Sequence, residues 1–289
     1  MKKFHYIIIG KRFCICAVAA VILLAFTAFT AAGFDKTLTT AGTDRKLPIY
    51  CVDKQEKKIS LSFDAAWGNE DTEHLIEIFK KYNVKVTFFV VGEWVVKFPE
   101  SVKALADAGH EIMNHSDTHP HMPQLSIEKM TEQINACNDK IEKITGRRPT
   151  LFRAPYGDYD NNLIDALSSL NMYCIQWDVD SLDWKDYTAD KISERVLSKV
   201  RPGSICLFHN AAKHTPEALP IILEKLIADG YEIVPISQLI MTNNFTINHE
   251  GRQIANATAA TTKLTTTEKS TDKYDNSKTS KYMMLDFNE

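Results

Sequence analysis

Between residues 58 and 240, short apolar runs alternate with longer stretches whose apolar residues recur every three or four positions. Runs rich in β-branched and aromatic residues predict buried strands, whereas the 3.6-residue period predicts amphipathic helices. We expect strands over residues 58–63, 84–91, 110–114, 150–152, 172–178, 204–208 and 231–234. We expect helices over residues 72–82, 99–108, 126–145, 160–170, 188–199, 214–229 and 236–240.

An ordered alternation of strand and helix predicts parallel strands that are covered by helices. The seven expected strands favour an α/β fold of the closed or nearly closed kind, a distorted (β/α)7 barrel, and a doubly wound open sheet is the alternative. The apolar share of 44% supports a sizeable core, and we expect a monomer. A formal net charge of −3 gives no reason to expect a nucleic-acid partner.

The N-terminal segment has the pattern of a membrane anchor. Four cations fall within the first twelve residues, and the twenty residues 13–32 carry no charge. About 20 apolar residues span a bilayer, and the cations favour a cytoplasmic N-terminus. We therefore expect residues 1–34 to anchor an extracytoplasmic protein in the cell membrane. The small residues Thr30-Ala31-Ala32 leave a cleaved signal peptide, and hence secretion, as the alternative.

Two further segments are expected to lie outside the folded domain. Residues 35–57 are interpreted as a linker that leads into a domain at 58–240. From 241 to 289 the chain is rich in Thr, Asn, Lys and Ser and has little apolar periodicity. Such a composition cannot bury enough apolar surface to fold, so we expect a disordered, low-complexity tail.

One short stretch, His115-Ser-Asp-Thr-His119, has the spacing of a metal-ligand pair. Two imidazoles four residues apart share one face of a helical turn, and Pro120 would end that turn directly after the second imidazole. Both side chains could then bind one divalent ion. A solvated polar helix face is the alternative interpretation of the same spacing.

Residues suited to catalysis follow five of the expected strands. In a parallel barrel the C-terminal strand ends meet at one rim, where functional side chains gather. The residues at these positions are Asp64, His115, Arg153–Gly157, Asp178, Asp180, Asp183, Trp184 and His209. Each has an ordinary structural explanation, such as a turn aspartate or a buried histidine. Their common location at one rim nevertheless favours a single site.

Five motifs follow one another along these strand ends. They are Ser62-Phe-Asp64, His115-x-x-x-His119, Arg153-x-Pro-Tyr-Gly157, Asp180-Ser-Leu-Asp-Trp184 and Leu207-Phe-His209. Their types and order resemble the polysaccharide deacetylases of carbohydrate esterase family 4, which share the NodB homology domain, over residues 58–240. The stretch Ser62-Phe-Asp-Ala-Ala-Trp-Gly68 and the single N-terminal span most resemble the spore-former, PdaB-like sporulation branch, which acts on spore-cortex peptidoglycan.

The resemblance implies a metal-dependent hydrolysis of N-acetyl groups. A divalent ion, zinc or else cobalt, manganese or nickel, would be held by His115 and His119 and would polarise the acetamide carbonyl and the attacking water. Asp64 would accept the proton of that water, while Arg153 keeps its carboxylate ionised and oriented.

The resemblance also assigns the leaving group and the substrate pocket. His209 would protonate the leaving amine, with its imidazolium stabilised by Asp183. The backbone N–H of Tyr156 would hold the oxyanion, while Trp184 and Leu207 would shape the acetyl pocket.

One position departs from the family pattern. The family has two consecutive carboxylates in the first motif, the second of them a metal ligand, whereas this chain has Ala65. Two imidazoles make a weaker site than the three protein ligands usual for catalytic zinc. Asp64, Asp117, Glu70 or a water molecule are candidates for the third position. We expect weak metal binding, which Ala65→Asp should tighten if the neighbouring loop lets the new carboxylate reach the ion.

Two functions are consistent with this pattern. The first is a hydrolase that removes N-acetyl groups from cell-wall polysaccharide such as peptidoglycan. The alternative is a glycan-binding pseudoenzyme of the same fold with an impaired metal site. The presence of Asp64, Arg153, Asp183 and His209 favours the enzyme, because a binding protein has no catalytic need for the full set.

Overall fold

The computed structural model describes residues 45–256. The predicted membrane segment at 13–32, the start of the predicted linker and residues 257–289 of the predicted tail lie outside the described residues. Within residues 45–256, no helix is both long enough and apolar enough to cross a membrane. The described residues from Lys46 onward belong to one compact unit.

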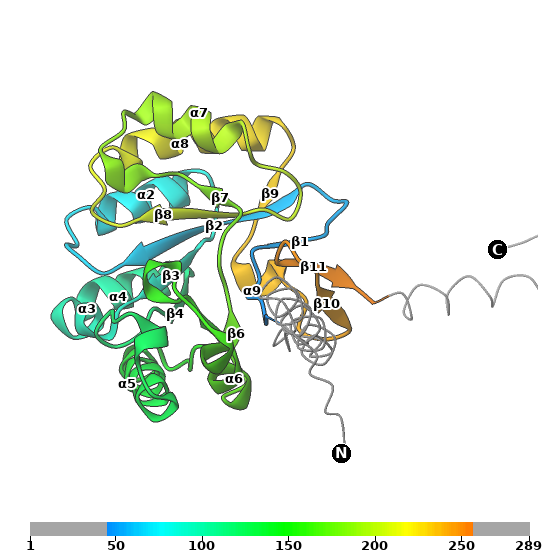
Figure 1. The fold of residues 1–289 in the computed structure, drawn as a ribbon. Coiled ribbons are helices and arrows are strands. Elements are labelled where there is room, and N and C mark those ends of the chain that lie inside the picture. Colours follow the sequence, from blue (N-terminus) through cyan, green and yellow to red (C-terminus); the bar gives the residue numbers. More distant parts are fainter. Residues whose placement is uncertain (1–44, 257–289) are drawn as a thin grey trace, which may run out of the picture. The chain divides into compact units, whose positions relative to one another are not determined.

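A curled sheet of parallel strands forms the centre of this unit (Figure 1). The strand order is β6-β5-β4-β3-β2-β8-β7, and β9 pairs with the first residues of β2. The longest of these strands, β2, lies between β3 and β8. The strands are β2 (Lys58–Ala65), β3 (Thr87–Val90), β4 (Glu111–Asn114), β5 (Leu151–Phe152), β6 (Tyr173–Cys174), β7 (Val179–Asp180), β8 (Ile205–His209) and β9 (Glu232–Ile233).

The expected curled, parallel α/β sheet is confirmed, but it forms a half-barrel instead of a closed or nearly closed barrel, because its edge strands β6 and β7 do not pair with each other. Of the strand expected at 172–178, only β6 at its start is formed; β7 begins directly after this range and lies on the opposite edge of the sheet. Between them the backbone leaves the ladder: the Gln176 N–H donates to the Ile49 carbonyl, and the Asp178 N–H donates to the Ile205 carbonyl. The chain therefore crosses the open side instead of adding a strand there.

Helices cover the outer face of the sheet, and each predicted helix is present with its ends shifted by at most two residues. Neighbouring helices pack in the order α7, α8, α2, α4, α5, α6. One further helix, α3 (Gly92–Lys97), was not predicted. The others are α2 (Thr72–Lys81), α4 (Pro99–Asp107), α5 (Ile127–Thr145), α6 (Asn161–Ser169), α7 (Ala189–Leu197), α8 (Thr215–Ala228) and α9 (Ile236–Leu239).

Alternation along β2 separates the core from the site. Phe63 faces the helices, where its ring stacks on Phe88 at 5.0 Å and on Phe208 at 5.3 Å between ring centroids. Successive side chains of a strand point to opposite faces, so Ser62 and Asp64 face the interior of the half-barrel. The apolar layer between sheet and helices thus fixes which face carries the polar residues.

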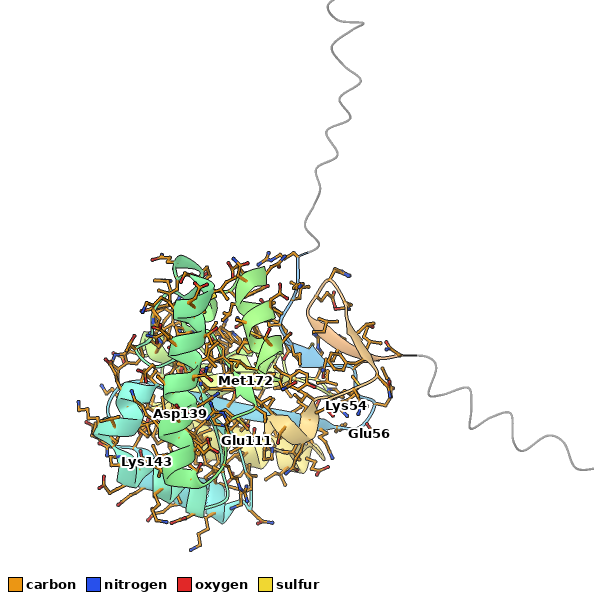
Figure 2. The ribbon with its side chains drawn as sticks, turned by 90° about the horizontal axis from the view of Figure 1, so that it is seen from below. Lys54, Glu56, Glu111, Asp139, Lys143 and Met172 are labelled. Atoms are coloured by element: carbon orange, nitrogen blue, oxygen red, sulfur yellow. The ribbon has the colours of Figure 1, made fainter. Side chains whose placement is uncertain are left out.

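A small second sheet lies beside the half-barrel, formed by segments that we expected to be linker and tail. Its order is β1-β11-β10, with β1 (Cys51–Val52), β10 (Phe245–Ile247) and β11 (Arg252–Ala255). Lys54 and Glu56, in the turn after β1, are seen from below in Figure 2. The folded part therefore extends beyond the expected bounds of 58 and 240. The polar composition of these segments did not predict strands. Some of their polar side chains bind backbone groups: the Gln253 amide accepts a hydrogen bond from the Met241 N–H and donates one to the Met241 carbonyl.

Candidate active site

The predicted site residues converge at the C-terminal rim of the strands. In the sheet register Asp64 on β2 is paired with His209 on β8 and with Phe89 on β3. A pocket of about 440 Å³ opens beside them. Seven of the nine predicted site residues line it: Asp64, His115, His119, Tyr156, Trp184, Leu207 and His209. The other two, Arg153 and Asp183, are buried and bind residues of the pocket wall.

Arg153 holds Asp64 from beneath the pocket. Its Nη1 donates to Asp64 Oδ1 at 2.8 Å, and its Nη2 donates to Ser62 Oγ at 2.8 Å and to the Gln176 carbonyl at 3.2 Å. The guanidinium is fully buried and lies 4.2 Å from the ring centroid of Phe89. Burial alone raises the pKa of Asp64, but the charge of Arg153, followed by the neighbouring histidines, lowers it below its ordinary value. The carboxylate is therefore ionised and fixed in orientation.

His115 and His119 come together, but not on the helical turn that we expected. Residues 115–121 form a loop in which Ser116 and His119 have left-handed φ values of 68° and 58°. The Asn114 side chain accepts the Ser116 N–H at 2.7 Å, and the Ser116 hydroxyl accepts the His119 N–H at 3.1 Å. These local bonds compete with helix formation and bring the two imidazole centroids to 4.9 Å.

Both imidazoles are suited to bind a metal ion in their neutral form. Burial lowers the pKa of His115, and burial together with His115 lowers the pKa of His119 to about 4. The Nδ1 of His115 lies 2.8 Å from the Arg153 carbonyl, which can only accept, so Nδ1 carries the proton. This leaves the Nε2 lone pair free, 3.6 Å from Asp64 Oδ2.

The two imidazoles could together bind one divalent cation. They do not by themselves provide the three protein ligands that are usual for catalytic zinc. Among residues 45–256, no three His, Cys, Asp or Glu side chains are grouped closely enough to hold an ion. Asp117 accepts a bond from Lys140 at 2.5 Å, and Glu70 accepts the Asn69 N–H at 2.9 Å; neither lines the pocket. Of the three carboxylates considered as substitutes, only Asp64 lies there.

The Ala65 side chain faces the apolar layer in this backbone. β2 continues through Ala65, which is paired with Val90, so its side chain faces away from Asp64. Ala65 is 0% exposed and packs in the apolar cluster that contains Phe63 and Val90. A carboxylate at this position would enter the layer between sheet and helices. Ala65→Asp is therefore expected to tighten metal binding only if the loop after β2 rearranges.

His209 is paired with Asp183 on the other side of the pocket. Its Nδ1 lies 2.8 Å from Asp183 Oδ1, while Asp183 Oδ2 accepts the His209 N–H at 2.9 Å and the Thr215 hydroxyl at 2.7 Å. Burial alone lowers the pKa of His209, but the hydrogen bond and charge of Asp183 raise it above its ordinary value. The raised pKa favours the protonated form of His209, which lies next to the ionised Asp64.

Tyr156, Trp184 and Leu207 form the wall of the pocket. Tyr156 has a left-handed φ of 61°. Its ring lies 4.6 Å from that of His119 and is stacked on His121 at 4.1 Å. Leu207 is buried, whereas Trp184 is largely exposed. The apolar wall is compatible with the role expected for Trp184 and Leu207.

Five residues of the site were not predicted as site residues, and one of them, Trp177, lines the pocket with its ring 5.5 Å from the Arg153 guanidinium. Ser62 and Gln176 bind the guanidinium of Arg153, and Trp67 lines the pocket. Asn210 holds the loop after β2: its Nδ2 donates to the carbonyls of Trp67 and Gly68. Ser62 could have been found from its position two residues before Asp64 on the same strand face. The other contacts join segments that are distant in sequence.

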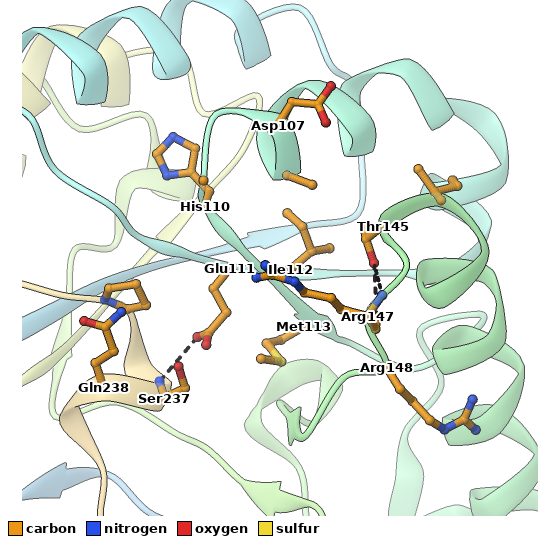
Figure 3. A pocket seen from close by; sticks show the side chains of 14 residues that line it. Asp107, His110, Glu111, Ile112, Met113, Thr145, Arg147, Arg148, Ser237 and Gln238 are labelled. Atoms are coloured by element: carbon orange, nitrogen blue, oxygen red, sulfur yellow. Dashed lines mark hydrogen bonds between the residues drawn. The ribbon is translucent and has the colours of Figure 1, made fainter.

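A second cavity, of about 480 Å³, lies where Glu111 begins β4, at the opposite ends of the strands (Figure 3). Glu111 accepts bonds from the Thr87 hydroxyl at 2.7 Å and the Ser237 N–H at 3.4 Å. Arg148 is paired with Asp139 and Glu142 on α5. The charged side chains of this cavity therefore bind neighbouring strands and helices of the fold. We assign the candidate active site to the first pocket.

Comparisons with known proteins agree with this architecture. Residues 52–175 match the family model described as Polysaccharide deacetylase. The chain is 38% identical over 188 residues to the peptidoglycan-N-acetylmuramic acid deacetylase PdaC of Bacillus subtilis (strain 168), with 65% of this chain and 40% of the relative covered. It is 32% identical over 190 residues to a peptidoglycan-N-acetylglucosamine deacetylase of Bacillus cereus, with 64% and 69% covered. The chain spans 40% and 60% of the first two curated relatives that it matches.

Solved structures of the same fold include BA3943 of Bacillus anthracis, described as a carbohydrate esterase family 4 pseudoenzyme. Its wild type is 34% identical with a TM-score of 0.65, covering 72% of this chain and 70% of that chain. A BA3943 mutant with restored enzymatic activity is 35% identical with a TM-score of 0.65, covering 72% of each. The fold, the converging motifs and these relatives lead to one conclusion: the chain belongs to the polysaccharide deacetylase family.

Proposed function

We propose that this protein is a hydrolase that removes N-acetyl groups from cell-wall polysaccharide, with peptidoglycan as its polymer. The observation that carries the proposal is the pairing of Asp64 with Arg153 and of His209 with Asp183 at adjoining strand ends. One pair holds a base without its proton and the other holds an acid with its proton. Amide hydrolysis needs both in one pocket.

In this proposal Asp64 accepts a proton from the water that attacks the acetamide carbonyl carbon. The Tyr156 N–H faces the oxygen that becomes negative. His209 then gives its proton to the amine nitrogen as the C–N bond breaks, which yields acetate and a free amino sugar. A divalent cation, held by His115 and His119, would supply polarisation of the carbonyl and of the water.

The test is acetate release from peptidoglycan and from chitooligosaccharides by the purified protein, with Zn²⁺, Co²⁺, Mn²⁺ or Ni²⁺ added. Asp64→Asn is the control, because it preserves shape and removes basicity. We expect acetate from the wild type and a rate lower by roughly 10²–10⁴-fold in the variant. Glycan binding without acetate under all four metals would instead support the pseudoenzyme, for which the incomplete metal ligand set is the supporting observation.

We also propose that the domain acts outside the cytoplasm, anchored by the N-terminal segment. The support is the sequence of that segment, four cations followed by the uncharged run at 13–32. The resemblance of Ser62–Gly68 to the spore-former branch supports cortex peptidoglycan as one such polymer. A reporter fused after residue 256 should be active only outside the cytoplasm, and activity inside would contradict this location.

A further inference from the structure

The turn that carries Tyr156 has a strained backbone. Tyr156 has a left-handed φ of 61°, and the next residue, Gly157, has a φ of 69°. In this region a Cβ crowds the following carbonyl oxygen, so a residue such as Tyr156 keeps the conformation only where its surroundings hold it. In the proposed function this turn presents the Tyr156 N–H to the oxygen that becomes negative. The contacts that hold the turn therefore decide where that N–H points.

The entry to the turn is held by β4 and by the residue that follows it. The Arg153 N–H donates to the Asn114 carbonyl at 3.0 Å, and the Arg153 carbonyl lies 2.8 Å from Nδ1 of His115. Within the turn, the Gly157 N–H donates to the Ala154 carbonyl at 3.0 Å. These bonds fix the residue that enters the turn, and a separate contact holds the residue that leaves it.

That separate contact comes from the side chain of Gln176. Its Nε2 donates to the Gly157 carbonyl at 3.0 Å, and the residue is 1% exposed. The Gln176 backbone is fixed on both sides, because its N–H donates to the Ile49 carbonyl at 2.7 Å and its carbonyl accepts from Arg153 Nη2 at 3.2 Å. The approach is close: a Cβ on Gly157 would lie 3.0 Å from the Trp177 ring. The amide thus reaches the turn from a rigid support.

Gln176 connects two parts of the proposed reaction. Its carbonyl binds Arg153, whose Nη1 donates to Asp64 Oδ1 at 2.8 Å. Its side chain binds the turn that contains Tyr156. Gln176 does not itself line the pocket. Any effect that it has on the reaction must therefore pass through the residues that it holds.

We propose that the Gln176 side chain is a positioning residue, which fixes the turn at Tyr156 and so directs the Tyr156 N–H at the reacting carbonyl oxygen. The inference rests on the proposed function and adds to it a residue that lies outside the five motifs. A displaced oxyanion donor weakens binding of the transition state more than binding of the substrate. Loss of the Gln176 amide should therefore lower kcat and leave KM nearly unchanged.

The kinetic test compares Gln176→Met with Gln253→Met in the full-length protein. Methionine is similar in length to glutamine and cannot donate a hydrogen bond. Gln253 is the matched control, because it is 0% exposed and its amide also binds backbone groups, those of Met241, in the small second sheet. For acetate release we expect kcat to fall by about 10–100-fold in Gln176→Met, with KM within about twofold of the wild type. Neither constant should change in Gln253→Met.

A second variant, Gln176→Asn, keeps a buried amide but shortens its reach by one methylene. It should lower kcat in the same direction and by a smaller factor, and it carries the test if methionine prevents folding. An effect of lost stability alone would lower kcat in Gln253→Met as well, because that variant also loses buried hydrogen bonds.

Hydrogen–deuterium exchange measures the turn without turnover. The N–H groups of Gly157 and Asp158 donate to carbonyls within the turn at 3.0 Å each, so a looser turn exposes them. In the peptide that spans residues 153–158, exchange should be about tenfold faster in both Gln176 variants than in the wild type. Exchange of this peptide in Gln253→Met should match the wild type.

The outcomes separate this inference from the proposed function. Unchanged exchange in both Gln176 variants would overturn the inference, and so would an active protein whose kcat is unchanged in both. Equal kcat losses in Gln176→Met and Gln253→Met would also overturn it. If the wild type releases no acetate, the proposed hydrolysis fails, and exchange alone decides whether Gln176 holds the turn.

Discussion

At the scale of single residues, the site places a carboxylate with a lowered pKa, Asp64, beside an imidazole with a raised pKa, His209. Asp64 and His209 are register partners on adjacent strands, yet each has its own buried counter-charge behind it. Arg153 lowers the pKa of Asp64 against the effect of burial, and Asp183 raises the pKa of His209 against the same effect. Two titratable groups whose pKa values are driven apart in this way can serve as base and acid at one pH.

This arrangement predicts the pH dependence of kcat/KM. Asp64 must be ionised, so activity is lost as the pH falls through its lowered pKa; His209 must be protonated, so activity is lost as the pH rises through its raised pKa. Asp183→Asn removes the main cause of the second shift and should move the alkaline limb to lower pH. Asp180→Asn removes a smaller cause of the same upward shift in the His209 pKa and should move the alkaline limb less. Equal profiles for wild type and Asp183→Asn would contradict the assignment.

Position 65 gives a prediction opposite to that from sequence alone. Ala65→Asp would place a carboxylate among Phe63 and Val90, which should destabilise the fold by about 1–3 kcal/mol without tightening metal binding. Thermal melting and metal titration of wild type and variant check this, with Ala65→Ser as a small uncharged control. A rise in metal affinity at unchanged melting temperature would show that the loop after β2 can rearrange.

Most of the residues that form the pocket could be predicted from sequence, because their types and their places after apolar runs are local properties. Asp64, Arg153 and His209 are of this kind. The direction in which the Ala65 side chain points could not be predicted from sequence. It depends on whether β2 continues through residue 65, and the pairing of Ala65 with Val90 extends the strand that far. The conformation at His119 also escaped prediction, because Asn114 and Ser116 replace helical bonds with side-chain bonds.

At the scale of elements, the loop after β2 is the part that most shapes the pocket. Its residues Ala66, Trp67 and Gly68 are all bound by Asn210, whose side chain also accepts the Ala66 N–H at 3.3 Å. Asn210 directly follows His209 at the end of β8, so the same strand end carries the proposed acid and the residue that anchors the neighbouring loop. The positions of the helices could be predicted from the period of their apolar residues. The contact between Asn210 and the loop after β2 could not, because it does not depend on a periodic pattern in the sequence.

Asn210→Leu tests that anchor with a side chain of the same branching that has no polar atoms. The Trp67 carbonyl loses its donor, and we expect a stability loss of about 1–3 kcal/mol and a KM for oligosaccharide that rises more than kcat falls. Trp94→Phe removes the other donor to Gly68 while Asn210 remains, so it should act in the same direction and less strongly. Denaturant melts and steady-state kinetics measure both. A variant with wild-type KM would mean that the loop is held without Asn210.

At the scale of the whole molecule, the half-barrel is completed by segments with little sequence signal. The Ile49 N–H donates to the Cys174 carbonyl beside β6, and the Val52 N–H donates to the Gly203 carbonyl just before β8. Residues 49–52 therefore bridge the two sides that the strands leave unpaired. Sequence could give the repeating strand–helix order, but bridging by short irregular segments depends on backbone bonds, which have no residue preference.

The C-terminal strands should accordingly contribute to the stability of the domain. A chain that ends at residue 240 lacks β10 and β11, so the Tyr50 N–H loses the Gly251 carbonyl and the Asp53 N–H loses the Gln253 carbonyl. At about 1 kcal/mol for each hydrogen bond, the free energy of unfolding should fall by roughly 2 kcal/mol, apart from the apolar surface that is newly exposed. A chain that ends at residue 256 keeps these bonds and is the control. If both chains unfold at the same denaturant concentration, the small sheet packs on the domain without stabilising it, and the fold would be complete at residue 240.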